Sequence, residues 1–308
     1  KIQELKDRIA CVIVGQEQTV DLVLTAILAN GHVLIEGVPG VAKTLLARLT
    51  ARLIDADFSR IQFTPDLMPS DVLGTTVFNM KTNGFDFHQG PIFADIVLVD
   101  EINRAPAKTQ AALFEVMEER QISIDGTTHR MGDLYTILAT QNPVEQEGTY
   151  KLPEAQLDRF LMKITMDYPS LEEEVNILER HHTNAALVKL DDITPAITKE
   201  EVLSLRAFMN QVFVDRTLLQ YIALIVQQTR TSKAVYLGAS PRASVAMLQS
   251  SKAYALLQGR DFVTPEDIKF VAPYVLQHRL ILTAEAEMEG YSPVKVTQRL
   301  IDKVEVPK

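Results

Sequence analysis

The stretch Glu36 to Thr44 reads Glu-Gly-Val-Pro-Gly-Val-Ala-Lys-Thr and directly follows the apolar run 33–35. A buried strand, a tight glycine loop and a helix start in this order form a cradle for phosphate. Gly37 and Gly40 let the backbone turn tightly enough to aim N–H groups at a phosphate, and the helix N-terminus adds positive potential. In this arrangement Lys43 reaches the β- and γ-phosphates, and Thr44 holds Mg²⁺.

Ala42 departs from the general phosphate-loop pattern, which has glycine just before the lysine. A methyl group is the smallest possible intrusion, so Ala42 needs a little room but does not forbid the loop. Taken alone, the stretch is also compatible with an ordinary glycine-containing turn between a strand and a helix. The other motifs of the chain decide between these two interpretations.

A second stretch supplies acids suited to nucleotide hydrolysis. The run 96–99 is aliphatic throughout, as is typical of a strand buried in a parallel sheet, and it ends in Asp100 and Glu101. Asp100 is placed to hold Mg²⁺ through water, and Glu101 to orient or deprotonate the attacking water. Solvated strand-end acids are the alternative, which the preceding phosphate loop disfavours. Asn142, after the predicted strand 134–140, could fix the water or the γ-phosphate, or simply form an Asn-Pro turn.

Two arginines are candidate catalytic residues because of their positions in the sequence. Arg159 comes just before the predicted strand 161–166, on an edge from which it could reach the γ-phosphate of a neighbouring subunit. Arg242 follows Ser240-Pro241 at a helix start, where a cation is unfavourable for the helix dipole and is expected to serve another charge. A structural ion pair is the alternative for each arginine.

The periodicity predicts an α/β domain followed by a helical one. Apolar strands alternate with helices at about 32–36, 58–63, 96–99, 134–140 and 161–166. This alternation predicts a doubly wound P-loop domain with a parallel five-stranded core sheet and its site at the carboxyl ends of the strands. After residue 170 only helical patterns follow, at about 171–182, 198–213, 215–230, 241–257, 264–278 and 283–289. We therefore expect a nucleotide-binding domain over 1–169 and an all-helical domain over 170–308.

Two hairpins are predicted as insertions in the α/β domain. The stretch 75–89 alternates around a turn-rich centre, and 121–128 has Asp125-Gly126 in a two-residue turn. Such hairpins are surface flaps or contacts for a substrate, and the sequence leaves both possibilities open. Connecting loops are expected at 145–151 and 184–195.

Composition excludes several classes of protein. The chain has 308 residues, 46% hydrophobic, and a net charge of −9, which argues against a general affinity for nucleic acid. No apolar stretch approaches the length of a membrane span, so a cytoplasmic protein is expected. Cys11 is the only cysteine, which rules out an internal disulfide, and its apolar neighbours predict a buried thiol.

Together, these motifs resemble a MoxR-type AAA+ ATPase over essentially the whole chain. Ala42, unusual for the general phosphate loop, is what this family usually has. The similar segments are Val14-Gly15-Gln16 before a helix, 37–44 as Walker A, 99–105 as Walker B, 139–143 as sensor 1, 157–160 as the arginine-finger segment and 238–242 as sensor 2. The stretches 64–93 and 121–131 are similar to the family's helix-2 and pre-sensor insertions.

The resemblance implies a Mg²⁺-dependent ATPase that forms a ring, expected to be a homo-hexamer, with ATP between subunits. The implied catalytic residues are Glu101, Asn142, Arg159 and Arg242, with Arg159 acting in trans, and the implied metal ligands are Thr44 and Asp100. The implied ATP-binding residues are Gly15, Gln16, Gly37, Val38, Pro39, Gly40, Val41, Ala42, Lys43, Thr44 and Leu45. Hydrolysis would move the helical lid, and the hairpins would pass that motion to a client protein.

MoxR-like proteins are associated with von Willebrand factor A-domain partners and with protein maturation, including metal or cofactor insertion. The leading hypothesis is therefore a chaperone-like ATPase that remodels a protein. A metal-chelatase motor subunit would differ in having a dedicated chelatase partner. A nucleotide-gated scaffold has no use for Glu101 and Arg159, and a DNA translocase is disfavoured by the acidic charge.

Overall fold

The computed structural model describes residues 1–142, 149–183 and 190–307. The predicted loops at 145–151 and 184–195 lie in part outside the described residues. The chain packs as two compact units, each described here by itself. Unit 1 comprises Lys1–Val20, His32–Leu152 and Thr165–Leu203, and unit 2 comprises Asp21–Gly31, Pro153–Ile164 and Ser204–Lys308. The domain boundary near residue 170 stays a prediction.

A five-stranded sheet forms the centre of the α/β fold. Its strands, in spatial order, are β2 (Phe58–Gln62), β5 (Ile96–Asp100), β8 (Thr136–Gln141), β1 (Val33–Gly37) and β9 (Met162–Met166). Neighbouring strands from β2 to β1 pair in parallel. Every residue of β5 is buried, because an aliphatic strand can pack on both faces of a parallel sheet. The predicted parallel core sheet of five strands is confirmed.

The strand register aligns the carboxyl ends of the central strands. Val99 of β5 pairs with Ala139 of β8, and Ile35 of β1 pairs with Thr140 of β8. The residues that directly follow β5, β8 and β1 therefore emerge at the same edge of the sheet.

Helices precede, connect and follow these strands. In the first part of the chain they are α1 (Ile2–Val12), α2 (Glu17–Leu28), α3 (Lys43–Leu53), α4 (Pro69–Leu73), η1 (Ile102–Arg104), α5 (Ala107–Glu119), α7 (Leu171–His182) and η2 (Leu190–Asp192). The short helix α4 is not predicted from the sequence. It begins at Pro69, and the carboxylate of Asp71 accepts the amide N–H of Met68 at 2.8 Å.

The exposure of Cys11 differs from the expected buried thiol. The thiol is exposed, not buried. The buried stripe of α1 consists of Leu5 and Ile9, and a residue two positions after Ile9 points to the opposite side of a helix. The prediction of a buried thiol was wrong, because helical periodicity, and not the apolar character of adjacent residues, decides which side chains share the buried face.

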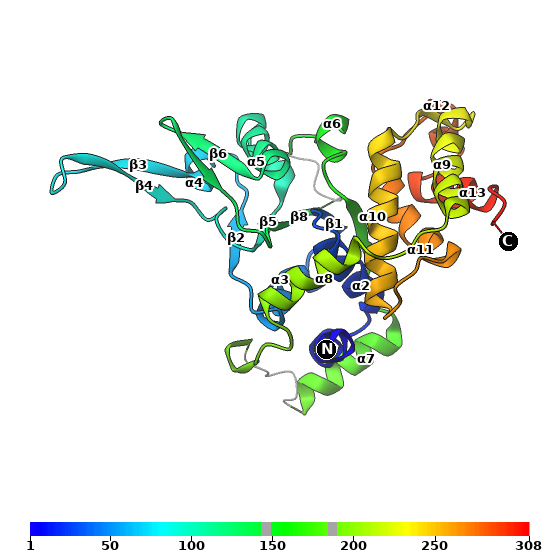
Figure 1. The fold of residues 1–308 in the computed structure, drawn as a ribbon, viewed down its shortest axis with the longest axis horizontal. Coiled ribbons are helices and arrows are strands. Elements are labelled where there is room, and N and C mark those ends of the chain that lie inside the picture. Colours follow the sequence, from blue (N-terminus) through cyan, green and yellow to red (C-terminus); the bar gives the residue numbers. More distant parts are fainter. Residues whose placement is uncertain (143–148, 184–189, 308) are drawn as a thin grey trace. The chain divides into compact units, whose positions relative to one another are not determined.

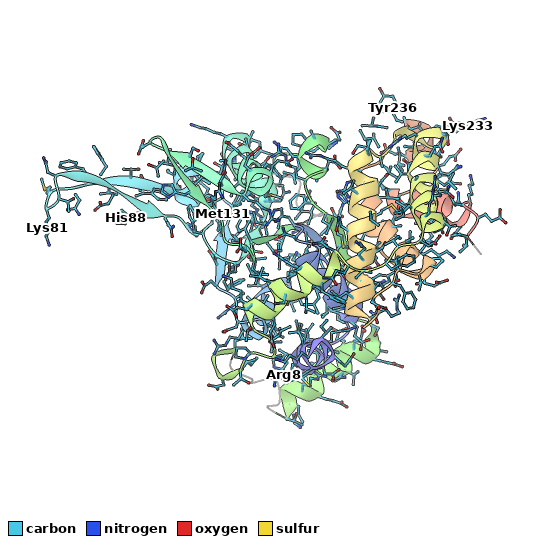
Figure 2. The ribbon with its side chains drawn as sticks, in the orientation of Figure 1. Arg8, Lys81, His88, Met131, Lys233 and Tyr236 are labelled. Atoms are coloured by element: carbon cyan, nitrogen blue, oxygen red, sulfur yellow. The ribbon has the colours of Figure 1, made fainter. Side chains whose placement is uncertain are left out.

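Both predicted hairpins are confirmed. They are β3 (Gly74–Asn79) with β4 (Gly84–Gln89), and β6 (Gln121–Ile124) with β7 (Thr127–Arg130). Asp125 and Gly126 both have positive φ, 50° and 77°, which the two-residue turn requires. The longer hairpin extends away from the sheet with Lys81 at its far end (Figures 1 and 2). Phe87 of β4 packs on His129 of β7, with ring centroids 4.3 Å apart.

The remaining part of the chain is mainly helical. Its helices are α6 (Glu154–Leu157), α8 (Lys199–Met209), α9 (Arg216–Thr231), α10 (Pro241–Leu257), α11 (Pro265–Leu276), α12 (Ala284–Met288) and α13 (Pro293–Asp302). The helices α10 and α11 pack side by side (Figure 1). Thr264 caps α11 in a capping box with Asp267.

Two features of this region are not predicted. Helix α13 begins at Pro293 behind the N-cap Ser292 and lies beyond the last predicted helix. A short antiparallel pair, β10 (Val235–Leu237) with β11 (Ile281–Leu282), makes the region less than purely helical. Strands of two or three residues are too short to show an alternating pattern in sequence.

No helix among the described residues combines the length and apolarity needed to cross a lipid bilayer.

Candidate active site

The glycine loop joins β1 to α3 in unit 1. A Cβ on Gly37 would lie 2.7 Å from the carbonyl oxygen of Met166, so only glycine fits there without a shift. Gly40 has φ +89°, in the left-handed region that glycine adopts freely. Ala42 is also left-handed, with φ 62° and ψ 24°, and as the N-cap of α3 it makes no side-chain capping bond. The first N–H groups of α3 therefore have no capping side chain over them.

Lys43 is the first residue of α3 and its side chain folds back over the loop. Its Nζ donates a hydrogen bond of 2.6 Å to the carbonyl oxygen of Gly37. Burial lowers the pKa of Lys43, and the negative charges of Asp100 and Glu101 oppose that shift. The ammonium group thus lies within electrostatic range of both strand-end acids.

The other predicted loop residues follow this path. Val41 is buried, Val38, Thr44 and Leu45 are partly buried, and Pro39 is exposed. Thr44 and Leu45 belong to the first turn of α3.

Asp100 is the last residue of β5 and is almost buried, with 7% of its surface exposed. Its Oδ2 lies 2.6 Å from Nε of Arg60 on β2. Its Oδ1 accepts a hydrogen bond of 3.1 Å from Oγ1 of Thr140 on β8. Three neighbouring strands therefore define the position of this carboxylate.

Glu101 leaves the strand in a left-handed conformation, with φ 55° and ψ 52°. Its amide donates to Oγ1 of Thr140 at 3.0 Å. Its Oε2 accepts from Nε2 of Gln62 at 3.0 Å and lies 2.8 Å from Nε of Arg104. A non-glycine residue in this conformation is held by its surroundings, here by Thr140 on its backbone and two donors on its side chain.

Asn142 directly follows β8 and is 7% exposed. The preceding residue, Gln141, pairs with Glu36 just before the glycine loop. Since β8 lies between β1 and β5, Asn142 emerges between the loop and the acids. Pro143, the last residue of the predicted sensor segment, lies outside the described residues.

Gly15 and Gln16 precede α2 in unit 1. Gly15 has φ +73°, and a Cβ there would lie 2.3 Å from the carboxyl carbon of Glu173 at the start of α7. Gln16 Oε1 accepts a hydrogen bond of 2.9 Å from Thr19 Oγ1. The segment is thus a tight turn against α7.

Arg159 and Arg242 both belong to unit 2. Arg159 follows α6, and its amide N–H donates to the carbonyl oxygen of Gln156 at 3.2 Å. Arg242 is an exposed residue in the first turn of α10, behind the N-cap Ser240. Burial lowers the pKa of Arg279, and the positive charge of Arg242 adds to this shift, so the two arginines are near one another.

Sequence reasoning missed several residues of this site. Arg60 and Gln62 lie on β2, and Thr140 is the residue of β8 that bonds both acids. The alternating pattern of β2 was visible, but only the sheet order shows that β2 lies beside β5, with Gln62 opposite Asp100. For Thr140, a hydroxyl residue near the end of the otherwise apolar run 137–139 is a signal that could have pointed to the site.

Comparisons with known proteins agree with this arrangement. The family model "ATPase family associated with various cellular activities (AAA)" matches residues 32–162, and the AAA lid domain matches residues 227–302. Chaperone MoxR1 of Mycobacterium tuberculosis is 44% identical over 306 residues, with 96% of this chain and 80% of the relative covered. The chain belongs to the MoxR family of AAA+ ATPases.

Other comparisons extend over similar lengths. Protein MoxR of Methylorubrum extorquens is 30% identical, with 91% of this chain and 87% of the relative covered. The crystal structure of a candidate ATPase from Cytophaga hutchinsonii superposes with a TM-score of 0.91 at 42% identity, over 100% of this chain and 95% of that one. Membership of this AAA+ family implies that the chain binds nucleotide.

Proposed function

We propose that this MoxR-family chain hydrolyses ATP with Mg²⁺ and uses the energy to remodel a client protein or complex. The observation that carries the proposal is the group at the carboxyl edge of the sheet. There the glycine loop ends at Lys43, whose ammonium lies within electrostatic range of the carboxylates of Asp100 and Glu101.

The residues present fit a nucleoside triphosphate and its metal. The N–H groups of the loop and of α3 would hold the phosphates, and Lys43 would exchange its bond to the Gly37 carbonyl for the β- and γ-phosphates. Thr44 and Asp100 offer the oxygen ligands that Mg²⁺ prefers. The bound Mg²⁺ would neutralise charge on the phosphates.

Glu101 would orient or deprotonate the attacking water, and Asn142 would hold the water or the γ-phosphate. The carboxylate of Glu101 now accepts from Gln62 and is paired with Arg104. Exchange of one of these donors for water would bring the carboxylate into its catalytic role. Thr140 would keep the backbone of Glu101 in place during that exchange.

We further propose that the active assembly is a homo-hexameric ring in the cytoplasm. In that ring Arg242 would act on the ATP of its own subunit, and Arg159 would reach the γ-phosphate of the neighbouring subunit. An arginine supplied in trans stabilises charge that develops in the transition state of phosphoryl transfer. The family membership and the place of Arg159 in the matched AAA segment support this assignment.

The client is proposed to contact the two hairpins. The longer hairpin exposes Phe78, Met80 and Phe85, and Met80 is 88% exposed. A pocket of about 680 Å³ between the hairpins is lined in part by Phe85 and His129. Exposed apolar surface of this kind suits contact with another protein. We also propose that the chain works with a partner that has a von Willebrand factor A domain. The remodelling would serve the maturation of a metal- or cofactor-containing protein.

Phosphate release from ATP tests the proposal, with the wild-type chain, Glu101→Gln and the surface control Glu115→Gln. Wild type and control should hydrolyse ATP only with Mg²⁺. Glu101→Gln should bind ATP as tightly and lose at least 100-fold in turnover. Full turnover by Glu101→Gln would contradict the catalytic assignment, and ATP binding without turnover by wild type would favour a nucleotide-gated scaffold.

A further inference from the structure

Arg279 is a buried cation that the proposed mechanism does not use. It lies three residues beyond the end of α11 in unit 2, and its side chain is 4% exposed. Its Nε donates to Oδ1 of Asp158 at 2.6 Å. Its other nitrogens donate to backbone carbonyl oxygens, including that of Leu161 at 3.1 Å. A buried guanidinium needs such a full set of acceptors, so its position is closely determined.

Two of these acceptors flank the proposed arginine finger. The Nη2 of Arg279 donates to the carbonyl oxygen of Phe160 at 2.7 Å and to that of Asp158 at 3.2 Å. Asp158 and Phe160 are the residues immediately before and after Arg159. A single nitrogen atom therefore holds the backbone on both sides of Arg159.

The two residues before Arg279 bind the same segment. The Nε2 of Gln277 donates to the carbonyl oxygen of Lys163 at 2.5 Å, and Nε2 of His278 lies 3.0 Å from the carbonyl oxygen of Phe160. The end of α11 thus binds the backbone of 158–163 at several successive points. Helix α6 has only four residues and no buried ones, so the segment after it is held by these bonds together with the buried side chain of Phe160.

Asp158 joins this segment to the start of α10. While its Oδ1 binds Arg279, its Oδ2 accepts a hydrogen bond of 3.3 Å from Oγ of Ser240. Ser240 is the N-cap of α10, and Arg242 lies in the first turn of that helix. The carboxylate of Asp158 therefore connects the backbone that carries Arg159 with the helix start that carries Arg242.

We propose that Arg279, acting through Asp158 and the carbonyls around Arg159, is a positioning residue for ATP hydrolysis. It fixes the direction in which Arg159 leaves the backbone and ties that direction to the position of Arg242. The inference rests on the proposed function, in which Arg159 acts on the ATP of a neighbouring subunit. A clamp that only stabilised unit 2 would contribute to folding and not to turnover in trans.

The test uses Arg279→Lys and Asp158→Asn in the full chain. Lysine keeps the charge but cannot reproduce the planar fork of donors, and asparagine keeps the size but removes the ion pair. Arg260→Lys is the matched control, because Arg260 forms a comparable pair with Asp267 in the same unit, with Nη1 to Oδ2 at 2.7 Å. Turnover of Arg279→Lys and Asp158→Asn should fall at least tenfold with the KM for ATP changed less than threefold, while the control keeps its activity.

Mixing subunits separates positioning from stability. Glu101→Gln subunits cannot hydrolyse their own ATP but provide an intact Arg159, so mixing them with Arg279→Lys subunits should raise turnover above the sum of the two alone. Arg159→Ala subunits mixed in the same way test the trans action itself. Rescue of Arg159→Ala without rescue of Arg279→Lys would overturn this inference alone. Failure to rescue Arg159→Ala would overturn the trans mechanism of the proposed function.

A double variant keeps the inference testable if Arg279→Lys does not fold, or if Arg159 acts within its own subunit. In an Arg159→Ala background, Asp158→Asn should reduce turnover less than twofold further, because the residue it positions is already absent. A full tenfold additional loss would show that Asp158 acts independently of Arg159, and the positioning role would be wrong.

Discussion

Nε of Arg60 lies 2.6 Å from Oδ2 of Asp100, so the carboxylate proposed to hold Mg²⁺ is paired with a cation of the chain itself. The guanidinium lies against the carboxylate oxygen that the metal, or a water bound to it, would use. The Arg60 side chain is 52% exposed and the Asp100 side chain 10%, so solvent screens the ion pair on the Arg60 side, and the pair contributes about 1 kcal/mol or less. Metal binding therefore has to displace the weak ion pair between Arg60 and Asp100.

Arg60→Met should lower the Mg²⁺ concentration for half-maximal ATP hydrolysis by up to about fivefold, which corresponds to about 1 kcal/mol. A magnesium titration of turnover at saturating ATP measures this, with Arg8→Met as a control on α1. A higher magnesium requirement in Arg60→Met would mean that Arg60 orients Asp100 for the metal instead of competing with it.

Replacing Ala42 by glycine should change the free energy of unfolding in the opposite direction from the same substitution at an ordinary helical alanine. Ala42 is left-handed, a conformation that costs a residue with a Cβ roughly 1–2 kcal/mol, whereas glycine adopts it freely but loses more entropy on folding. Ala42→Gly should therefore raise the free energy of unfolding by up to about 1 kcal/mol. Ala10→Gly, at an exposed position of the right-handed helix α1, should lower it by about 1 kcal/mol. Chemical denaturation compares the two, and equal losses would contradict the strain assigned to Ala42.

Thr140→Val should separate ATP binding from hydrolysis. The Thr140 hydroxyl binds Oδ1 of Asp100 and the amide of Glu101, so its loss would release the two acids while the glycine loop stays unchanged. We expect turnover to fall at least tenfold and ATP affinity to change less than threefold. Thr136→Val, on the same strand and also buried, is the matched control. Equal losses in the two variants would mean that strand packing, not the acids, explains the effect.

His278 should make stability depend on pH. Burial holds its pKa well below the usual value, and the charges of Arg279 and Lys163 act in the same direction. The unfolded chain takes up a proton near pH 6.5 and the folded chain does not, so stability falls as the pH drops below 6.5, by at most about 1.4 kcal/mol per pH unit.

Replacing His278 should therefore flatten the pH dependence. Between pH 7.5 and 5.5, His278→Gln should lose about 1 kcal/mol less unfolding free energy than wild type. His182→Gln, at an exposed histidine, should behave as wild type. Denaturation at the two pH values measures the difference, and parallel losses in wild type and His278→Gln would show that His278 is protonated in the folded chain.

The sequence predicted the elements of the fold and the local motifs of the site, but not the contacts between distant elements. The glycine loop and the acids after β5 are continuous patterns, because a strand, a turn and a helix start leave marks over a few residues. Arg60 and Gln62 were not predicted as site residues, because the sequence of a single strand does not show which strands lie beside it in a parallel sheet. The pair of Arg279 and Asp158 joins residues 121 positions apart, so only the packed unit shows it.

The central claim is that ATP is hydrolysed at a site completed by a neighbouring subunit. Specific activity measured against protein concentration with saturating Mg²⁺ and ATP, alongside molar mass by light scattering, tests it most directly. Activity per subunit should rise as the ring forms, and Arg159→Ala should remove the rise. Constant activity per subunit in a protein that stays monomeric over the whole range would contradict it.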